Sequence, residues 1–146
     1  MYRIIFLSLV STLSISVFAG DDFNRESALQ SFKSECQLEL ALAMGLASEK
    51  ADGKSKKELM KVATKSKSPK VMTQMVGELF SVPELSGPTY MFYRFESCLV
   101  ANAQGKRAVE FANVHTQLEA CDVKKFEMED LVECIDTVLL TENKKI

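Results

Sequence analysis

Apolar residues recur every three or four positions along most of the chain, a spacing that places them on one side of an α-helix. The pattern is strongest between residues 25 and 50, where Leu38, Leu42 and Leu46 widen the apolar stripe to almost the whole circumference. A helix that is apolar on all sides is typical of the interior of a bundle. We therefore predict a first helix from just after Asn24 to about Lys50, in the middle of the fold.

Two helices with recognisable start signals follow. Ser55 and Glu58 have the spacing of a capping box, which predicts a short second helix from Ser55 to about Lys65. Ser68 followed by Pro69 has the pattern of an N-cap residue and a first-turn proline, so a third helix begins there. Two prolines and a glycine between residues 82 and 88 end that helix, and this segment is predicted to be a loop.

Three further helices are predicted in the second half of the chain. One runs from around Thr89 to about Ala103 and carries aromatic residues on several sides, one lies within residues 107–120, and one runs from about Phe126 to Leu140. No segment alternates between apolar and polar residues as a half-buried strand would. The sequence predicts an all-α fold, a single disulfide-stapled bundle of five to six helices.

The first nineteen residues have a different pattern. A short positive start is followed by an apolar run over residues 4–17, and Val17-Phe18-Ala19 places small residues where signal peptidase cuts. The run is too short and too rich in serine for a membrane span, and no other segment has the roughly 20 apolar residues that a span requires. We predict a signal peptide over residues 1–19, one helical domain over residues 20–146, and a periplasmic or secreted location with no stable membrane span.

Four cysteines, Cys36, Cys98, Cys121 and Cys134, lie in the predicted domain. They fit an exported protein because an oxidising compartment lets them pair. Four cysteines allow three pairings, and the sequence alone does not choose among them. We favour Cys36 with Cys98 and Cys121 with Cys134. The spacings of redox, haem and zinc motifs are missing, so we predict no cofactor and no metal site.

Charge is spread unevenly along the chain. Residues 50–70 hold eight lysines against two acidic residues, and residues 110–142 hold nine acidic residues against two lysines. The simpler interpretation is a pair of solvated helix faces that face each other across the bundle. The alternative is a basic patch that meets an acidic partner, with Lys56 and Lys57 as contacts. The net charge of residues 20–146, about −3, gives no reason to expect binding to nucleic acid.

The candidates for catalysis are weak. His115 is the only histidine, and no nucleophile motif such as Gly-x-Ser-x-Gly accompanies it. The carboxylates of the sixth helix fall on the expected solvated face rather than in a cleft that would separate their pKa values; they are Glu127, Glu129, Asp130, Glu133 and Asp136. We predict no catalytic residues and no enzymatic activity. The alternative is a small enzyme that uses His115 with a nearby carboxylate or serine.

The loop after the third helix is the best candidate for a contact surface. Val82, Leu85 and Tyr90 gather apolar side chains around Pro83, and loops carried on rigid helices are common sites of recognition. We predict that Val82, Pro83, Leu85 and Tyr90 contact a partner. The alternative is a loop that only closes the end of the bundle.

Four features follow one another in the first two thirds of the chain. They are Cys36 on an alanine-rich helix, the turn Lys50-Ala51-Asp52-Gly53-Lys54-Ser55, the loop Phe80-Ser81-Val82-Pro83, and Cys98. In these features the chain resembles a group of small exported bacterial proteins of unassigned function. The resemblance implies a Cys36–Cys98 disulfide and an all-helical fold. It does not extend to the last forty or so residues, which carry the second cysteine pair.

In size, export and helical composition the chain is also similar to periplasmic immunity proteins, which neutralise cell-wall amidases delivered by type VI secretion. We therefore expect an exported helical protein that acts by binding a protein partner. The sharper hypothesis is an inhibitor or immunity protein for a periplasmic or cell-wall enzyme. A stress or chaperone-like periplasmic protein is the second hypothesis, and the small enzyme is the third.

Overall fold

The computed structural model describes residues 23–123 and 127–145, and every regular element within these ranges is a helix. The helices are α1 (Arg25–Ala51), α2 (Lys56–Ala63), α3 (Pro69–Ser81), α4 (Gly87–Gln104), α5 (Phe111–Val123) and α6 (Met128–Asn143). The predicted all-α fold is confirmed. The proposed signal peptide, residues 1–19, lies outside the described residues. Among the helices of the described part, none combines the length and the hydrophobicity that crossing a membrane requires.

Local capping explains where the first helices begin. Asn24 Oδ1 accepts a hydrogen bond from the Ser27 amide over 2.9 Å at the start of α1. At the start of α2, Glu58 Oε2 accepts from the Ser55 amide over 2.8 Å, which completes the predicted capping box. Ser68 occupies the N-cap of α3 but makes no side-chain capping bond there.

The fourth helix begins two residues earlier than predicted. Ser86 is its N-cap, and Ser86 Oγ accepts a hydrogen bond from the Thr89 amide over 3.3 Å. Pro88 fits in the first turn because a proline there removes an amide that has no helical partner. Residues 87 and 88 of the predicted loop are therefore helical.

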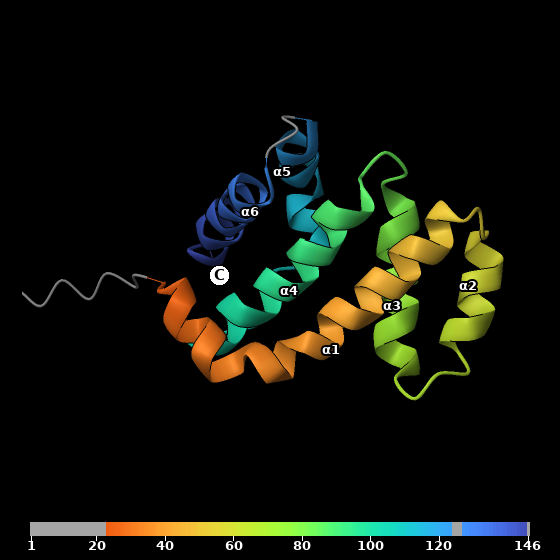
Figure 1. The fold of residues 1–146 in the computed structure, drawn as a ribbon, viewed down its shortest axis with the longest axis horizontal. Helices are drawn as coiled ribbons and strands as arrows, with labels where there is room; N and C mark the ends of the chain where they lie inside the picture. The colour runs from red at the N-terminus through yellow and green to blue at the C-terminus, as the bar shows by residue number, and fades with distance from the viewer. Residues whose placement is uncertain (1–22, 124–126, 146) are drawn as a thin grey trace, which may run out of the picture.

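The centre of the fold is α4, whereas we predicted that the first helix would be central. α4 packs against both α1 and α6, and the two helical hairpins α2–α3 and α5–α6 lie on either side (Figure 1). α1 is about 40 Å long and buries only one face, with Leu38 59 % and Met44 53 % exposed. α1 has apolar residues around its whole circumference but is not buried on all sides, because large aromatic side chains on α4 fill the centre of the fold. They include Tyr90, Tyr93 and Phe95.

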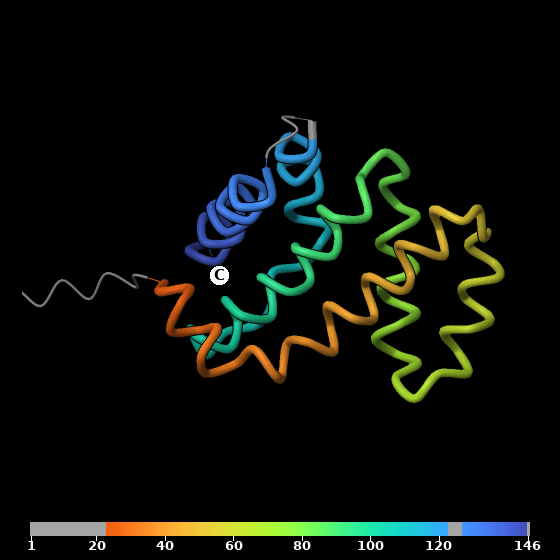
Figure 2. The backbone as a smooth tube through the Cα atoms, in the orientation of Figure 1, coloured from red at the N-terminus to blue at the C-terminus, as the bar shows by residue number. Residues whose placement is uncertain are grey.

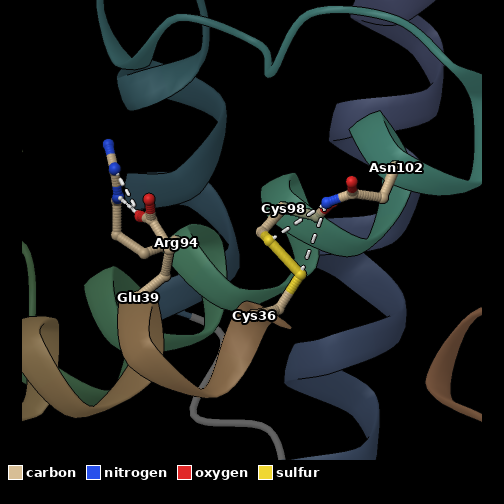
Figure 3. Close-up of a disulfide and its surroundings, with 5 residues drawn as sticks. All are labelled: Cys36, Glu39, Arg94, Cys98 and Asn102. Carbon is tan, nitrogen blue, oxygen red and sulfur yellow. Dashed lines mark hydrogen bonds and ion pairs between the residues drawn. A yellow bond between two sulfur atoms is a disulfide. The ribbon is translucent and has the colours of Figure 1, made fainter. Parts of the chain in front are cut away.

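Both favoured disulfides are present. Cys36–Cys98 joins α1 to α4, and Cys121–Cys134 joins α5 to α6. Figure 3 shows the Cys36–Cys98 bond beside Asn102, whose amide nitrogen lies 3.4 Å from Cys98 Sγ and donates to the Cys98 carbonyl over 2.9 Å. The two crosslinks fix α1 to the central helix and close the α5–α6 hairpin.

The two charged segments do not face each other as we expected. α2, with most of the lysines, lies at one end of the long axis of the molecule, and α6 lies toward the other end (Figure 1). The chain path in Figure 2 shows the reason: the α2–α3 hairpin extends from the far end of α1, while α6 returns to pack on α4 near the start of α1. The molecule therefore has a basic end and an acidic end.

Candidate binding groove

A groove runs along the side of α4 that faces outward between α1 and α6. It consists of two adjoining hollows, of about 770 Å³ and about 420 Å³, and Phe92 lines both. The larger hollow lies between the start of α1 and α6 and includes Phe23, Arg25, Met128, Val132, Asp136 and Leu140. The smaller hollow lies between α1 and α4 and includes Leu40, Met44 and Met91. We call the two together the α4 groove.

Helix packing explains why the groove is open. α1 and α6 both pack on α4 and enclose its buried face, but Met91 and Phe92 point toward the space between them and stay half-buried. Met128 at the α6 side is 68 % exposed, and Met44 at the α1 side is also exposed. The floor of the groove is thus aromatic, and flexible methionines stand at its two sides.

Three ionisable side chains from three helices meet at the inner wall of the larger hollow. Arg25 on α1 donates to Glu96 on α4 through Nε over 3.1 Å and through Nη2 over 2.5 Å. Arg25 Nε also lies 3.5 Å from Asp136 Oδ2 on α6. The Glu96 side chain is fully buried. A buried carboxylate requires a partner of this kind, because removing an unpaired charge from water is costly.

The position of Asp136 corrects the prediction that the α6 carboxylates share one solvated face. Glu127, Glu129, Asp130 and Glu133 are exposed, but the Asp136 side chain is only 13 % exposed and its Oδ1 is buried without a hydrogen-bond partner. Burial, together with the neighbouring Glu96 carboxylate, raises the pKa of Asp136 to about 8, against the opposing effect of Arg25.

This pKa determines the charge of the groove. Near neutral pH, Asp136 is mostly protonated, so Arg25 and Glu96 form a balanced ion pair and the inner wall is close to neutral. Glu129 and Glu133, which also line the hollow, keep their exposure to solvent and form no ion pair within the described residues. The groove is therefore apolar at its floor and acidic along its α6 side. Such a surface is suited to an apolar segment that carries positive charges.

The sequence offered one signal for this cluster that we did not use. Glu96 follows Phe95 in the most apolar part of α4, and both of its chain neighbours are buried. A single charged residue in an apolar helix is a reason to search for a buried partner. The partner itself comes from tertiary packing, since Arg25 and Glu96 are 71 positions apart.

The predicted contact loop buries most of its predicted contact residues. Val82, Leu85 and Tyr90 belong to the main core, and only Pro83 among the four predicted contact residues is exposed. The Tyr90 side chain is anchored to α3, because its hydroxyl donates a hydrogen bond to Glu78 Oε2 over 2.8 Å. Lys50 Nζ donates to the carbonyls of Leu79 and Pro83 over 2.9 and 3.1 Å, which ties the loop to α1. The apolar side chains of this loop thus pack into the core, and contact of this loop with a partner stays a prediction.

The two predicted lysine contacts are accessible. Lys56 and Lys57 are exposed on α2, as are the neighbouring lysines of the α2–α3 hairpin. They lie at the opposite end of the molecule from α6, so the structure does not combine them with the α4 groove in one site (Figure 1).

His115 lies apart from the groove, in a hollow of about 450 Å³ between α3 and α5 that also includes Glu78, Ser81 and Glu110. Its Nδ1 is 3.4 Å from Glu119 Oε1, one turn away on the same helix. Ser81 Oγ donates to the Glu78 carbonyl over 2.7 Å rather than to the imidazole. His115 thus has a carboxylate beside it, whereas the serine of this hollow is bonded to its own backbone; the small-enzyme alternative stays a prediction.

Metal ligands are also not grouped: within residues 23–123 and 127–145, no three histidine, cysteine, aspartate or glutamate side chains are placed to hold a metal ion. Comparisons with known proteins add no further assignment, because no family model, no curated protein and no solved structure matches this chain.

Proposed function

We propose that this chain is an exported binding protein that holds a segment of a protein partner in the α4 groove. The observation that carries the proposal is the groove itself, an open aromatic floor between two helices with exposed methionines at its sides. Open hollows that are lined mainly by apolar side chains, with a few polar groups, are a common form of binding site. The export signal pattern of residues 1–19 and the two disulfides support a periplasmic or secreted location.

The charge of the groove specifies the partner segment further. Glu129 and Glu133 line the α6 side, and the Arg25–Glu96 pair leaves no free positive charge at the inner wall. A segment with aromatic or aliphatic side chains toward Phe92 and with lysine or arginine toward α6 complements both features. Such a segment on a periplasmic or cell-wall enzyme would make this protein an inhibitor or immunity protein, which is the role that we favour.

A groove substitution with a matched control tests this proposal. Met128→Lys with Val132→Lys places two positive charges on the groove wall, whereas Leu38→Lys alters an exposed apolar residue of α1 that lies outside both hollows. Each tagged protein is purified from the periplasm of the native host, bound proteins are identified by mass spectrometry, and a captured enzyme is assayed with increasing amounts of each variant.

We expect the unsubstituted protein and Leu38→Lys to capture one stoichiometric enzyme and to inhibit it, and the double variant to lose both properties. If the double variant captures and inhibits equally well, the groove is not the binding site. If no captured protein is inhibited by the unsubstituted chain, the inhibitor role is wrong.

A chaperone-like role is the second candidate, and one observation favours it. Met44 and Met128 are both exposed beside the groove, and methionine side chains adapt to apolar partners of many shapes. This role predicts that the protein suppresses the aggregation of an unrelated, thermally unfolding protein, and that Met128→Lys with Val132→Lys weakens the suppression. A protein that inhibits one enzyme and leaves this aggregation unchanged would exclude it.

A further inference from the structure

The α2 end of the molecule carries a concentrated positive charge. Seven exposed lysines lie on α2, on the turns beside it and at the start of α3: Lys54, Lys56, Lys57, Lys61, Lys65, Lys67 and Lys70. We call these residues the lysine end. Of these seven lysines, only Lys54 forms an ion pair within the described residues, with Glu49. Glu58, the acidic residue of α2, is occupied by the capping box with Ser55.

The fold directs these lysines away from the rest of the protein. α2 buries Leu59 and Ala63 against α3, which leaves its outer side to solvent at one end of the long axis (Figure 1). Val62, on the outer side of α2 among the lysines, is 55 % exposed. The α2–α3 hairpin is therefore a convex, cationic end with one apolar side chain at its surface.

The anionic partner of the lysine end could be an acidic protein or a lipid surface, and the composition of this end favours the lipid surface. Residues 50–70 contain no arginine and no aromatic residue. Protein interfaces draw most of their binding energy from buried aromatic and arginine side chains, which the lysine end lacks. Lysine is a flexible point charge on a long stem, and several of them on a convex surface match a fluid layer of phosphate headgroups, where no fixed geometry is required.

We propose that the lysine end attaches the protein to the surface of a membrane that contains anionic phospholipids. Each lysine near such a surface contributes about 1 kcal/mol, so several together give reversible, salt-dependent binding without any inserted segment. The acidic α6 is repelled by the same surface. The protein is thereby oriented with α6 and its side of the α4 groove away from the membrane. This inference does not depend on what the groove binds.

Vesicle binding tests the proposal. The processed protein is mixed with vesicles of phosphatidylglycerol and phosphatidylethanolamine, or of phosphatidylcholine alone, and the bound fraction is measured by sedimentation at increasing salt. The variant Lys57→Glu, Lys61→Glu and Lys67→Glu reverses three charges of the lysine end. The control Lys33→Glu, Arg107→Glu and Lys144→Glu makes the same change in net charge at exposed residues elsewhere. Circular dichroism checks that both variants are folded.

We expect binding to the phosphatidylglycerol vesicles only, weakening as salt rises. The lysine-end variant should lose more than about tenfold in partition coefficient, while the control changes by less than about twofold. The variant Lys57→Gln, Lys61→Gln and Lys67→Gln should also lose binding. It removes three positive charges without adding negative ones, so it controls for repulsion by the new glutamates.

Three results would overturn the proposal: equal binding to both kinds of vesicle, an equal loss in the control variant, or no vesicle binding at all. If the unsubstituted protein ignores the vesicles but binds polyglutamate at low salt, the lysine end meets an acidic protein instead of a lipid surface.

Discussion

Arg94 on α4 donates through Nε to Glu39 on α1 over 2.9 Å, one helical turn from the Cys36–Cys98 disulfide (Figure 3). The same guanidinium reaches α3, where its Nη1 lies 3.3 Å from Glu78 Oε2. Arg94 is mostly buried, with a side chain that is 13 % exposed. One arginine therefore pairs with two carboxylates and joins α1 and α3 to the central helix α4.

Replacing Arg94 should be among the more destabilising single changes in this protein. Arg94→Met keeps the apolar stem but leaves Glu39 and Glu78 without their cation, and we expect the free energy of unfolding to fall by about 2–4 kcal/mol. Urea denaturation followed by circular dichroism measures the change. In the background of Glu39→Gln and Glu78→Gln the same substitution should cost clearly less, and an equal cost there would contradict this account.

The two disulfides should contribute unequally to stability. Cys36–Cys98 closes a loop with a separation of 62 residues and Cys121–Cys134 one of 13 residues. By restricting the unfolded chain, the first disulfide should stabilise the folded protein by about 4 kcal/mol and the second by about 3 kcal/mol. Denaturation of the Cys36→Ala, Cys98→Ala variant and the Cys121→Ala, Cys134→Ala variant tests the order. A larger loss in the second variant would contradict it.

Asp136 should make the protein less stable as pH rises. Its pKa is about 8 in the folded protein and near 4 in the unfolded chain, so the folded state holds the extra proton between these values. The stabilisation that comes from this proton is complete below about pH 4 and is lost as the pH rises through about 8. We expect Asp136→Asn to remove this dependence and to stabilise the protein at pH 9 by at least about 1 kcal/mol relative to the unsubstituted chain.

The measurement is the urea midpoint of both proteins at pH 5, 7 and 9. Glu133→Gln, which neutralises an exposed carboxylate one turn earlier on the same helix, is the matched control. Parallel pH profiles for the unsubstituted chain and Asp136→Asn would show that Asp136 does not hold a proton in the folded state.

Asp122 should have the opposite pH dependence. Its two oxygens accept hydrogen bonds from the Ser86 amide over 2.9 Å and from the Ser86 and Thr89 hydroxyls over 2.6 Å each. Partial burial opposes ionisation, but these donors outweigh it and lower the pKa of Asp122. The stabilisation is therefore present above about pH 4 and is lost as the pH falls through the lowered value.

Substitution of Asp122 tests the same contacts at neutral pH. Asp122→Ala leaves the fully buried Thr89 hydroxyl and the start of α4 without their acceptor, and we expect a loss of about 1–3 kcal/mol in the free energy of unfolding. The loss should shrink in acid, where the unsubstituted Asp122 is itself protonated. A loss that is constant from pH 7 to pH 3 would contradict the assignment.

The sequence was sufficient for those parts of the fold that depend on neighbouring residues. Asn24 and the Ser55–Glu58 pair act within one helical turn, so the starts of α1 and α2 could be predicted within a residue. The favoured cysteine pairing was also correct. The identity of the central helix was wrong, because Leu38 and Met44 look like core residues until the packing of α4 is known.

The candidate groove could not be predicted in the same way. Arg25, Glu96 and Asp136 come together from three helices, and Phe92 lines the groove only because α1 and α6 stop short of covering it. Helical periodicity tells which residues share a side of one helix, but not which sides remain uncovered when several helices pack together. Val82 and Leu85 show the converse, since a loop rich in prolines can still bury its apolar residues.

The disulfides divide the molecule into helices that are crosslinked and a hairpin that is not. One disulfide joins α1 to α4 and the other joins α5 to α6, while within the described residues no disulfide joins the α2–α3 hairpin to another helix. We expect the backbone amides of this hairpin to exchange with deuterium faster than those of the crosslinked helices α1, α4, α5 and α6. Reduction of the disulfides removes the crosslinks of those helices, whereas the hairpin carries none. Deuterium exchange should therefore change less on reduction in the hairpin than in the crosslinked helices.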